Sequence, residues 1–166
     1  EEVGCQGSVA LARELEELLG EVPLPRLAWI GEPTAWARHV AHKGIVQCTV
    51  RVRGRGGHSS LPARGVNAIQ VAARAVDAIG RLQAELRMPR PEWQAVFPEA
   101  PCTTLNVGTL HGGTAANMIP EACAFEVSYR PLPDEPPLAV LDRIRELLDG
   151  LDLADHAGGD GRATVA

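Results

Sequence analysis

Within the stretch "GIVQCTVRVRG" (residues 44–54), residues 46–53 alternate strictly between apolar and polar side chains. Side chains that alternate in this way point to opposite faces of a β-strand. The apolar face comprises Val46, Cys48, Val50 and Val52, and the polar face comprises Gln47, Thr49, Arg51 and Arg53. One face of this strand must be covered while the other meets water, which is typical of an antiparallel sheet with helices on one side only.

The segments that follow supply the rest of such a sheet and its cover. Apolar residues recur at helical spacing within residues 66–86 and within residues 136–151. Further strands are predicted at residues 103–110, at 122–130 and from residue 162 onward. The order strand–helix–strand–strand–helix–strand predicts a βαββαβ, ferredoxin-like unit, in which one antiparallel sheet carries both helices on the same face.

The first forty residues follow a different pattern. A helix is predicted to begin with Ser8 as its N-cap and to end at Gly20. The apolar run at residues 27–30 predicts a strand buried on both faces, and a loop that carries Glu32 follows it. This order is typical of an α/β domain. We therefore predict part of an α/β domain over residues 1–41 and a separate α+β domain over residues 42–166.

Charge and cysteine content restrict the partners and the compartment. The 166 residues carry a formal net charge of -5, and Lys43 is the only lysine. This balance argues against a surface for nucleic acid or for an anionic membrane. No apolar run approaches the roughly 20 residues that span a bilayer. The four cysteines are far apart and form no C-x-x-C pair, so we expect free thiols and a cytoplasmic location.

Three places in the chain carry candidate catalytic or metal-binding groups. Glu1 and Glu2 are adjacent carboxylates, and at a strand end one could act as a base while the other binds an ion. Glu32 follows a buried strand, where a carboxylate is costly unless it is paired or bound to metal. His58 lies in a glycine-rich loop that would let the backbone approach a ligand. Taken singly, a solvated terminus, a turn residue and an exposed histidine are the simpler interpretations.

Asn117 and Arg130 are weaker candidates when each is taken alone. Asn117 lies in the loop before the strand at residues 122–130, and Arg130 ends that strand. By alternation Arg130 lies on the face opposite Tyr129, so its side chain is expected on the open face of the sheet. A turn asparagine and a solvated arginine would explain both residues.

Six segments together carry a resemblance to a known family. They occur in this order: "EEVGCQGS", "GEPT", "HKG", "VRGRGGHSSLPARGVNAI", "TTLNVGTLHGGTAANMIP" and "VSYRPLP". In sequence and spacing they resemble the zinc-dependent amidohydrolases of the peptidase M20 family. The resemblance extends from Glu1 to about Leu151. It implies a catalytic α/β domain that is interrupted by a βαββαβ lid domain, and the lid domain also forms the dimer.

The resemblance implies a metal site in the first domain. Glu1 matches the general base, Glu2 the carboxylate that bridges two metal ions, and Glu32 a ligand to one of them. Two zinc ions, or cobalt in their place, would lower the pKa of a shared water to near 7. A carboxylate base could then take the proton of the water and return it to the leaving amine.

The resemblance also implies roles for residues of the lid. His58 would reach the active site of the other subunit of a homodimer and stabilise the oxyanion there. Asn117 and Arg130 match lid positions that contact the carboxylate of the substrate, a small N-acyl amino acid, or the tetrahedral intermediate. The homodimer is expected to form through residues 43–166, with the helix at residues 66–86 or an adjacent strand at the contact.

Part of the family's metal site has no counterpart in the sequence. A histidine and an aspartate upstream and a histidine far downstream are missing, so we expect the chain to be an inactive fragment of a longer enzyme. The residues leave open whether that enzyme removes an acetyl or a succinyl group or cleaves a C-terminal residue. A different class of function also stays open, because a βαββαβ unit can serve as a small-molecule-binding or assembly module that catalyses no reaction.

Overall fold

The computed structural model describes residues 6–23, 26–27, 31, 35, 39, 41–151 and 161–165. The chain divides into two compact units, residues 1–38 and residues 39–166.

The first unit contains one described helix, α1 (Gln6–Leu19). Gly20 ends it in a left-handed conformation with φ of 57°, as predicted, and its N–H donates to the Glu16 carbonyl over 3.1 Å. The predicted N-cap at Ser8 is wrong, because α1 begins two residues earlier. Gly7 and Ser8 each cost the helix only about 1 kcal/mol or less relative to alanine, which is too little to prevent it from beginning before them. The predicted strand at residues 27–30 falls mainly outside the described residues.

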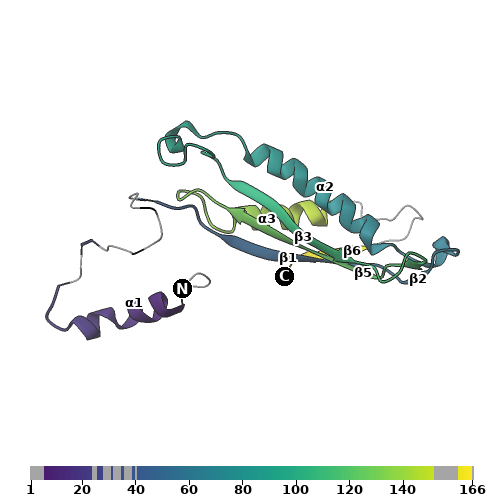
Figure 1. Cartoon of the computed structure of the whole chain (residues 1–166), viewed down its shortest axis with the longest axis horizontal. Helices are drawn as coiled ribbons and strands as arrows, with labels where there is room; N and C mark the ends of the chain where they lie inside the picture. The colour runs from purple at the N-terminus through teal and green to yellow at the C-terminus, as the bar shows by residue number, and fades with distance from the viewer. Residues whose placement is uncertain are drawn as a thin grey trace. The chain divides into compact units, whose positions relative to one another are not determined.

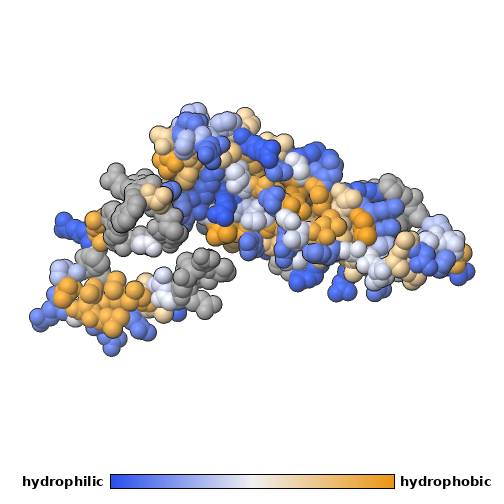
Figure 2. All heavy atoms as spheres, viewed as in Figure 1, coloured by the Kyte–Doolittle hydropathy of each residue, from blue (hydrophilic) through white to orange (hydrophobic). Residues whose placement is uncertain are grey.

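Helix α1 presents an apolar surface. Val9, Leu11 and Leu18 are all exposed, and Figure 2 shows apolar side chains gathered over this helix. An exposed apolar patch is more informative than a single exposed leucine, because it marks a surface that another element normally covers.

The second unit is an α+β domain built on a four-stranded antiparallel sheet (Figure 1). Its strands are β1 (Val46–Arg53), β3 (Thr104–Gly112), β5 (Ala122–Arg130) and β6 (Arg162–Val165). Their order in the sheet is β3-β5-β1-β6. Helix α2 (Ala68–Leu86) connects β1 to β3, and α3 (Ala139–Asp149) lies between β5 and β6. The predicted βαββαβ order is confirmed.

One face of the sheet carries the core. The alternation of β1 buries Cys48, Val50 and Val52, and β5 buries residues in the same alternating way. The two helices place their buried residues in the same cluster, so both cover this face. The members from β5, α2 and α3 include Phe125, Val127, Tyr129, Val71, Ala75, Ile79, Leu82, Val140, Ile144 and Leu148. The opposite face of the sheet carries polar side chains, such as Arg51 and Glu126, that are exposed.

A short second sheet was not predicted from the sequence. Strands β2 (Gly57–His58) and β4 (Met118–Ile119) pair antiparallel beyond the ends of β1 and β5. A bridge between Arg55 and Val66 brings the chain back towards α2. Gly54 permits this turn, because a Cβ there would lie 2.1 Å from the Val66 carbonyl oxygen. Two short 3-10 turns, η1 (Pro62–Arg64) and η2 (Pro91–Trp93), complete the described elements.

Within the described part of the chain, none of the helices is both long enough and apolar enough to cross a membrane.

The core cluster predicts a large difference between two neighbouring residues of α3. Ile144 is fully buried, so Ile144→Ala should lower the free energy of unfolding by about 2–5 kcal/mol. Arg145 is exposed and pairs with Asp142 over 3.1 Å, so Arg145→Ala should cost less than about 1 kcal/mol. Urea unfolding of the full chain, followed by circular dichroism, measures both. Equal losses in the two variants would contradict the assignment of the core.

Candidate functional site

The three predicted metal-site carboxylates cannot be placed. Glu1, Glu2 and Glu32 all lie outside the described residues. Among the residues that the structure does describe, no group of three or more His, Cys, Asp or Glu side chains could hold a metal ion. The predicted metal site therefore stays a prediction.

His58 of β2 lies next to Asn117, the residue immediately before β4. His58 pairs with Met118 across the two strands. The backbone N–H of Ser59 donates to the carbonyl of Asn117 over 3.0 Å. Both side chains are exposed. Two candidate residues that are 59 positions apart in the sequence are thus neighbours at one end of the domain.

The contacts of His58 indicate which ring nitrogen carries the proton. The backbone N–H of Ser60 lies 3.2 Å from Nδ1 of His58, and the Ser60 hydroxyl lies 2.7 Å from the same atom. A backbone N–H can only donate, so Nδ1 must accept and the proton of the neutral ring lies on Nε2. Nε2–H is then a donor that could stabilise a developing oxyanion.

Arg130 lies at the opposite end of the sheet from His58 and Asn117. It is exposed at the end of β5 and pairs with Thr104 of β3, whereas the other end of β5, Ala122, pairs with Arg53. The eight steps along β5 correspond to roughly 26 Å. The β2–β4 sheet lies beyond the Ala122 end. The structure brings His58 and Asn117 together and keeps Arg130 apart from both in the same chain.

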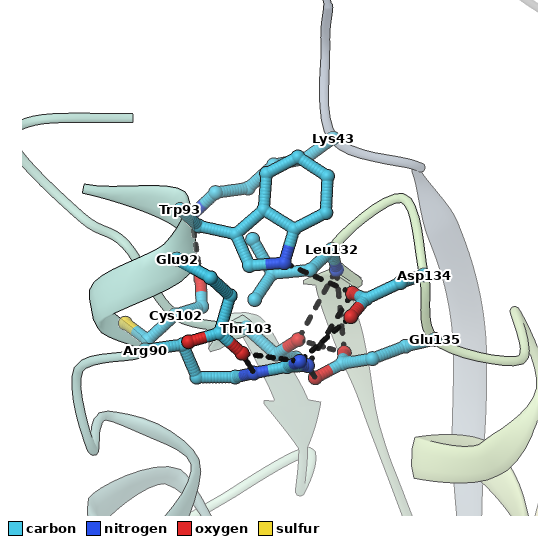
Figure 3. Close-up of polar contacts among 9 residues, drawn as sticks. All are labelled: Lys43, Arg90, Glu92, Trp93, Cys102, Thr103, Leu132, Asp134 and Glu135. Atoms are coloured by element: carbon cyan, nitrogen blue, oxygen red, sulfur yellow. Dashed lines mark hydrogen bonds and ion pairs between the residues drawn. The ribbon is translucent and has the colours of Figure 1, made fainter. Parts of the chain in front are cut away.

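A cluster of polar side chains gathers at the Arg130 end, and the sequence analysis missed it (Figure 3). We refer to Arg90, Glu92, Trp93, Thr103, Asp134 and Glu135 as the Arg90 cluster. The guanidinium of Arg90 donates to Glu92 over 2.7 Å and to Asp134 over 2.6 Å, and it reaches Glu135 at 3.4 Å. The indole N–H of Trp93 donates to Asp134 over 3.1 Å. These contacts join the loop after α2 to the turn after β5.

The start of β1 is tied to the same two segments. The ammonium of Lys43 donates to the Cys102 carbonyl over 2.6 Å and lies 5.5 Å from the ring centre of Phe97. The Gly44 N–H donates to the Pro131 carbonyl over 3.0 Å. A side chain at Gly44 would press on Pro131, because a Cβ would lie 2.9 Å from its Cγ. The chain thus enters the sheet between the loop after α2 and the turn after β5.

Charges in and near the Arg90 cluster shift the pKa values of its members. Hydrogen bonds to Glu92 and Asp134 raise the pKa of Arg90. The backbone N–H of Glu92 and the hydrogen bond from the Arg90 side chain both lower the pKa of Glu92. Desolvation opposes ionisation of Asp134, but the hydrogen bond from Arg90 and other donors outweigh it and lower the pKa of Asp134. Desolvation lowers the pKa of Lys43, and the nearby charge of Arg130 acts in the same direction.

The buried thiols of the sheet are not activated nucleophiles. Burial raises the pKa of Cys48 and of Cys123. Both are free cysteines in the core. A thiol must ionise to act as a nucleophile, so these two residues pack as small apolar side chains.

Comparison with known proteins places most of the chain in one family. Residues 40–156 match the family described as a peptidase dimerisation domain, M20. The acetylornithine deacetylase of Myxococcus xanthus is 40% identical over 149 residues, which are 90% of this chain and 36% of that protein. The acetylornithine deacetylase of Salmonella arizonae is 45% identical over 142 residues, which are 86% of this chain and 35% of that protein. The chain spans only about a third of the length of these relatives.

Solved structures share the fold at lower identity. An aminobenzoyl-glutamate utilization protein from Klebsiella pneumoniae gives a TM-score of 0.53 at 24% identity, over 75% of this chain and 28% of that protein. An amidase of the hydantoinase/carbamoylase family from Burkholderia multivorans gives a TM-score of 0.52 at 23% identity, over 75% of this chain and 28% of that protein. At these identities the likeness supports the fold alone.

The lowered pKa values of Glu92 and Asp134 predict a loss of stability in acid. The unfolded chain takes up protons at the ordinary carboxyl pKa of about 4, before the folded chain does. The stability that these groups contribute is therefore present above about pH 4 and lost as the pH falls through their folded values. Urea unfolding between about pH 5 and 3 should show a smaller acid-induced loss in Arg90→Gln than in the unsubstituted chain.

A matched control for this experiment is Arg145→Gln, which removes an exposed ion pair of α3 outside the Arg90 cluster. It should keep the pH dependence of the unsubstituted chain. An Arg90→Gln chain with an unchanged pH dependence would mean that Arg90 does not hold these carboxylates in solution.

Proposed function

The chain belongs to the peptidase dimerisation domain family of the M20 peptidases, and we propose that it is the lid-bearing segment of a zinc-dependent N-acyl-amino-acid amidohydrolase. Identities of 40–45% to acetylornithine deacetylases over 86–90% of the chain carry this proposal. The activity of the full-length enzyme would be hydrolysis of N2-acetylornithine to ornithine and acetate, a step of arginine biosynthesis. Residues 1–41 would belong to the catalytic domain and residues 42–166 to the lid. A cytoplasmic location also stays a prediction.

Other members of the family are the alternatives for the substrate. A succinyl-diaminopimelate desuccinylase or an M20 metallocarboxypeptidase would use the same lid with different pocket residues. A non-catalytic binding or assembly module remains the alternative of another class. The requirement for a divalent metal separates this last alternative from the hydrolases.

The exposed apolar face of α1 supports the assignment of the first unit to a larger domain. Leu11 and Leu18 are exposed and lie on one face of α1, and an apolar helix face of this kind normally packs against a sheet. The remaining parts of a catalytic α/β domain would provide that cover.

The chemistry of the proposed reaction rests on three carboxylates. Carboxylate oxygens are ligands that zinc accepts, so Glu2 and Glu32 would be residues that hold it. Zinc bound there would supply Lewis-acid activation of a water. Glu1, as the general base, would take a proton from the attacking water and give it to the leaving amine. The isolated chain should lack activity, since the family's other ligands are not among its residues.

The residues of the lid would bind and polarise the substrate. His58, with its proton on Nε2, would donate to the oxyanion, and the neighbouring Asn117 would assist it. Arg130 would bind the carboxylate of the substrate, because a guanidinium can donate two parallel hydrogen bonds to it. About 26 Å of β5 separates Arg130 from the other two in one chain. A site that uses all three would therefore draw on two chains.

A homodimer through the lid would supply the second chain. Strand β3 lies at one edge of the sheet, and an edge strand offers backbone groups for pairing with another copy. Helix α2 packs next to β3. Its outer side carries the small exposed residues Ala73, Gly80 and Ala84, and no atom lies within 4 Å of a Cβ built at Gly80. These features support α2 and β3 as the contact between two lids.

An assay of the full-length enzyme tests the proposed function. It should hydrolyse N2-acetylornithine faster than N-succinyl-diaminopimelate or a dipeptide. Chelation should abolish the activity and zinc should restore it, whereas the isolated 166-residue chain should show no turnover. A preference for one of the other substrates would move the assignment within the family, and full activity without a divalent ion would contradict the hydrolase proposal.

The proposed role of His58 predicts both a kinetic defect and its rescue. His58→Ala in the full-length enzyme should lower kcat by roughly 100-fold or more, with KM and zinc content nearly unchanged. Mixing this variant with a Glu1→Gln variant should restore part of the activity. If His58 acts across the dimer, each heterodimer contains one site with both defects and one with neither. Rescue that fails despite demonstrated subunit exchange would show that His58 does not act in the partner's site.

A further inference from the structure

Arg130 occupies the last paired position of its strand. Thr104 and Arg130 end the ladder between β3 and β5, so the direction of the Arg130 side chain depends on the turn that follows. Pro131 and Leu132, the next two residues, are buried although Arg130 itself is exposed. The turn is thus a fixed part of the core, from which an exposed guanidinium extends.

Thr103 and Glu135 fix this turn from one side. Thr103 is the one buried polar residue among those described, at 2% exposed. Its hydroxyl donates to the Glu135 carboxylate and also lies 3.3 Å from the N–H of Leu132. The same N–H lies 3.2 Å from Oε2 of Glu135. The peptide two positions after Arg130 is therefore held by two side chains from different segments (Figure 3).

The carboxylate of Glu135 accepts hydrogen bonds from three neighbouring groups. The groups that face it are the Thr103 hydroxyl, the Leu132 N–H and the guanidinium of Arg90 at 3.4 Å. The backbone N–H and the guanidinium can only donate, and a carboxylate accepts from all three. Arg90 is itself held by ion pairs with Glu92 and Asp134. Its guanidinium therefore has a fixed position from which it restrains Glu135.

The other side of the turn is fixed by the backbone of Gly44. Its N–H donates to the Pro131 carbonyl over 3.0 Å. The peptide group between Pro131 and Leu132 is thus bound on both sides, through the Pro131 carbonyl and through the Leu132 N–H. Lys43 adds a positive charge close enough to Arg130 for the two to affect each other.

We propose that Thr103 and Glu135 are positioning residues for Arg130. By fixing the turn after β5 they set the direction in which the guanidinium extends towards a bound carboxylate. A guanidinium that donates two parallel hydrogen bonds tolerates little misplacement, so a small shift of this turn weakens substrate binding. This inference rests on the proposed role of Arg130 in binding the carboxylate of the substrate.

A pair of substitutions at Thr103 in the full-length enzyme tests the proposal. Thr103→Val keeps the shape of the side chain but removes the hydroxyl, whereas Thr103→Ser keeps the hydroxyl. Thr103→Val should raise KM for N2-acetylornithine roughly tenfold with little change in kcat. Thr103→Ser should keep both KM and kcat near the values of the unsubstituted enzyme. Glu135→Gln, at a partly exposed site, should raise KM in the same way and provides a second variant if Thr103→Val does not fold.

A double-mutant cycle with Arg130→Ala separates positioning from general damage. In the Arg130→Ala background, Thr103→Val and Glu135→Gln should cause no further rise in KM, because the residue they position is gone. An additive rise, or equal KM values for Thr103→Val and Thr103→Ser, would overturn the inference while leaving the proposed function intact. Arg130→Ala with an unchanged KM would instead overturn the proposed role of Arg130 itself.

Discussion

Burial of a single face of the four-stranded sheet is the constraint on which the rest of the structure depends. Residues such as Val50 on β1 and Phe125 on β5 point to this face, and α2 and α3 both cover it. Each such side chain contributes about 1.5–3 kcal/mol when it is fully buried. Since both helices are used on one side, polar groups that act on a ligand can lie only on the open face or at the ends of the sheet.

The two ends of the sheet carry different chemical groups. His58 and Asn117 are brought together at one end by the β2–β4 pairing, and Arg130 lies at the other end, where the Arg90 cluster fixes the turn behind it. The length of β5 prevents these groups from meeting in one chain. The proposed oxyanion donor and the proposed carboxylate-binding residue are therefore compatible with one active site only if two lids contribute to it.

The sequence predicted the parts of the fold that depend on periodicity. The alternation in β1 and β5 and the helical spacing of α2 and α3 located these elements to within about three residues. The β2–β4 pairing was missed because strands of two residues, such as Gly57–His58, have no detectable period. The contact between Thr103 and Glu135 was missed because the partners are 32 residues apart. Arg130 was placed correctly on the open face at a strand end, whereas the proximity of His58 to Asn117 depends on tertiary pairing.

A distance measurement between two labelled subunits tests the two-chain site most directly. In the proposed homodimer of the full-length enzyme, one subunit would carry a spin label at His58→Cys and the other at Arg130→Cys, and pulsed electron resonance would give the distance between the labels. If two chains share the site, the distance between subunits will be clearly shorter than the distance between the same two labels within one subunit, which should be roughly 26 Å or more. A distance between subunits that exceeds the distance within one would contradict a shared site.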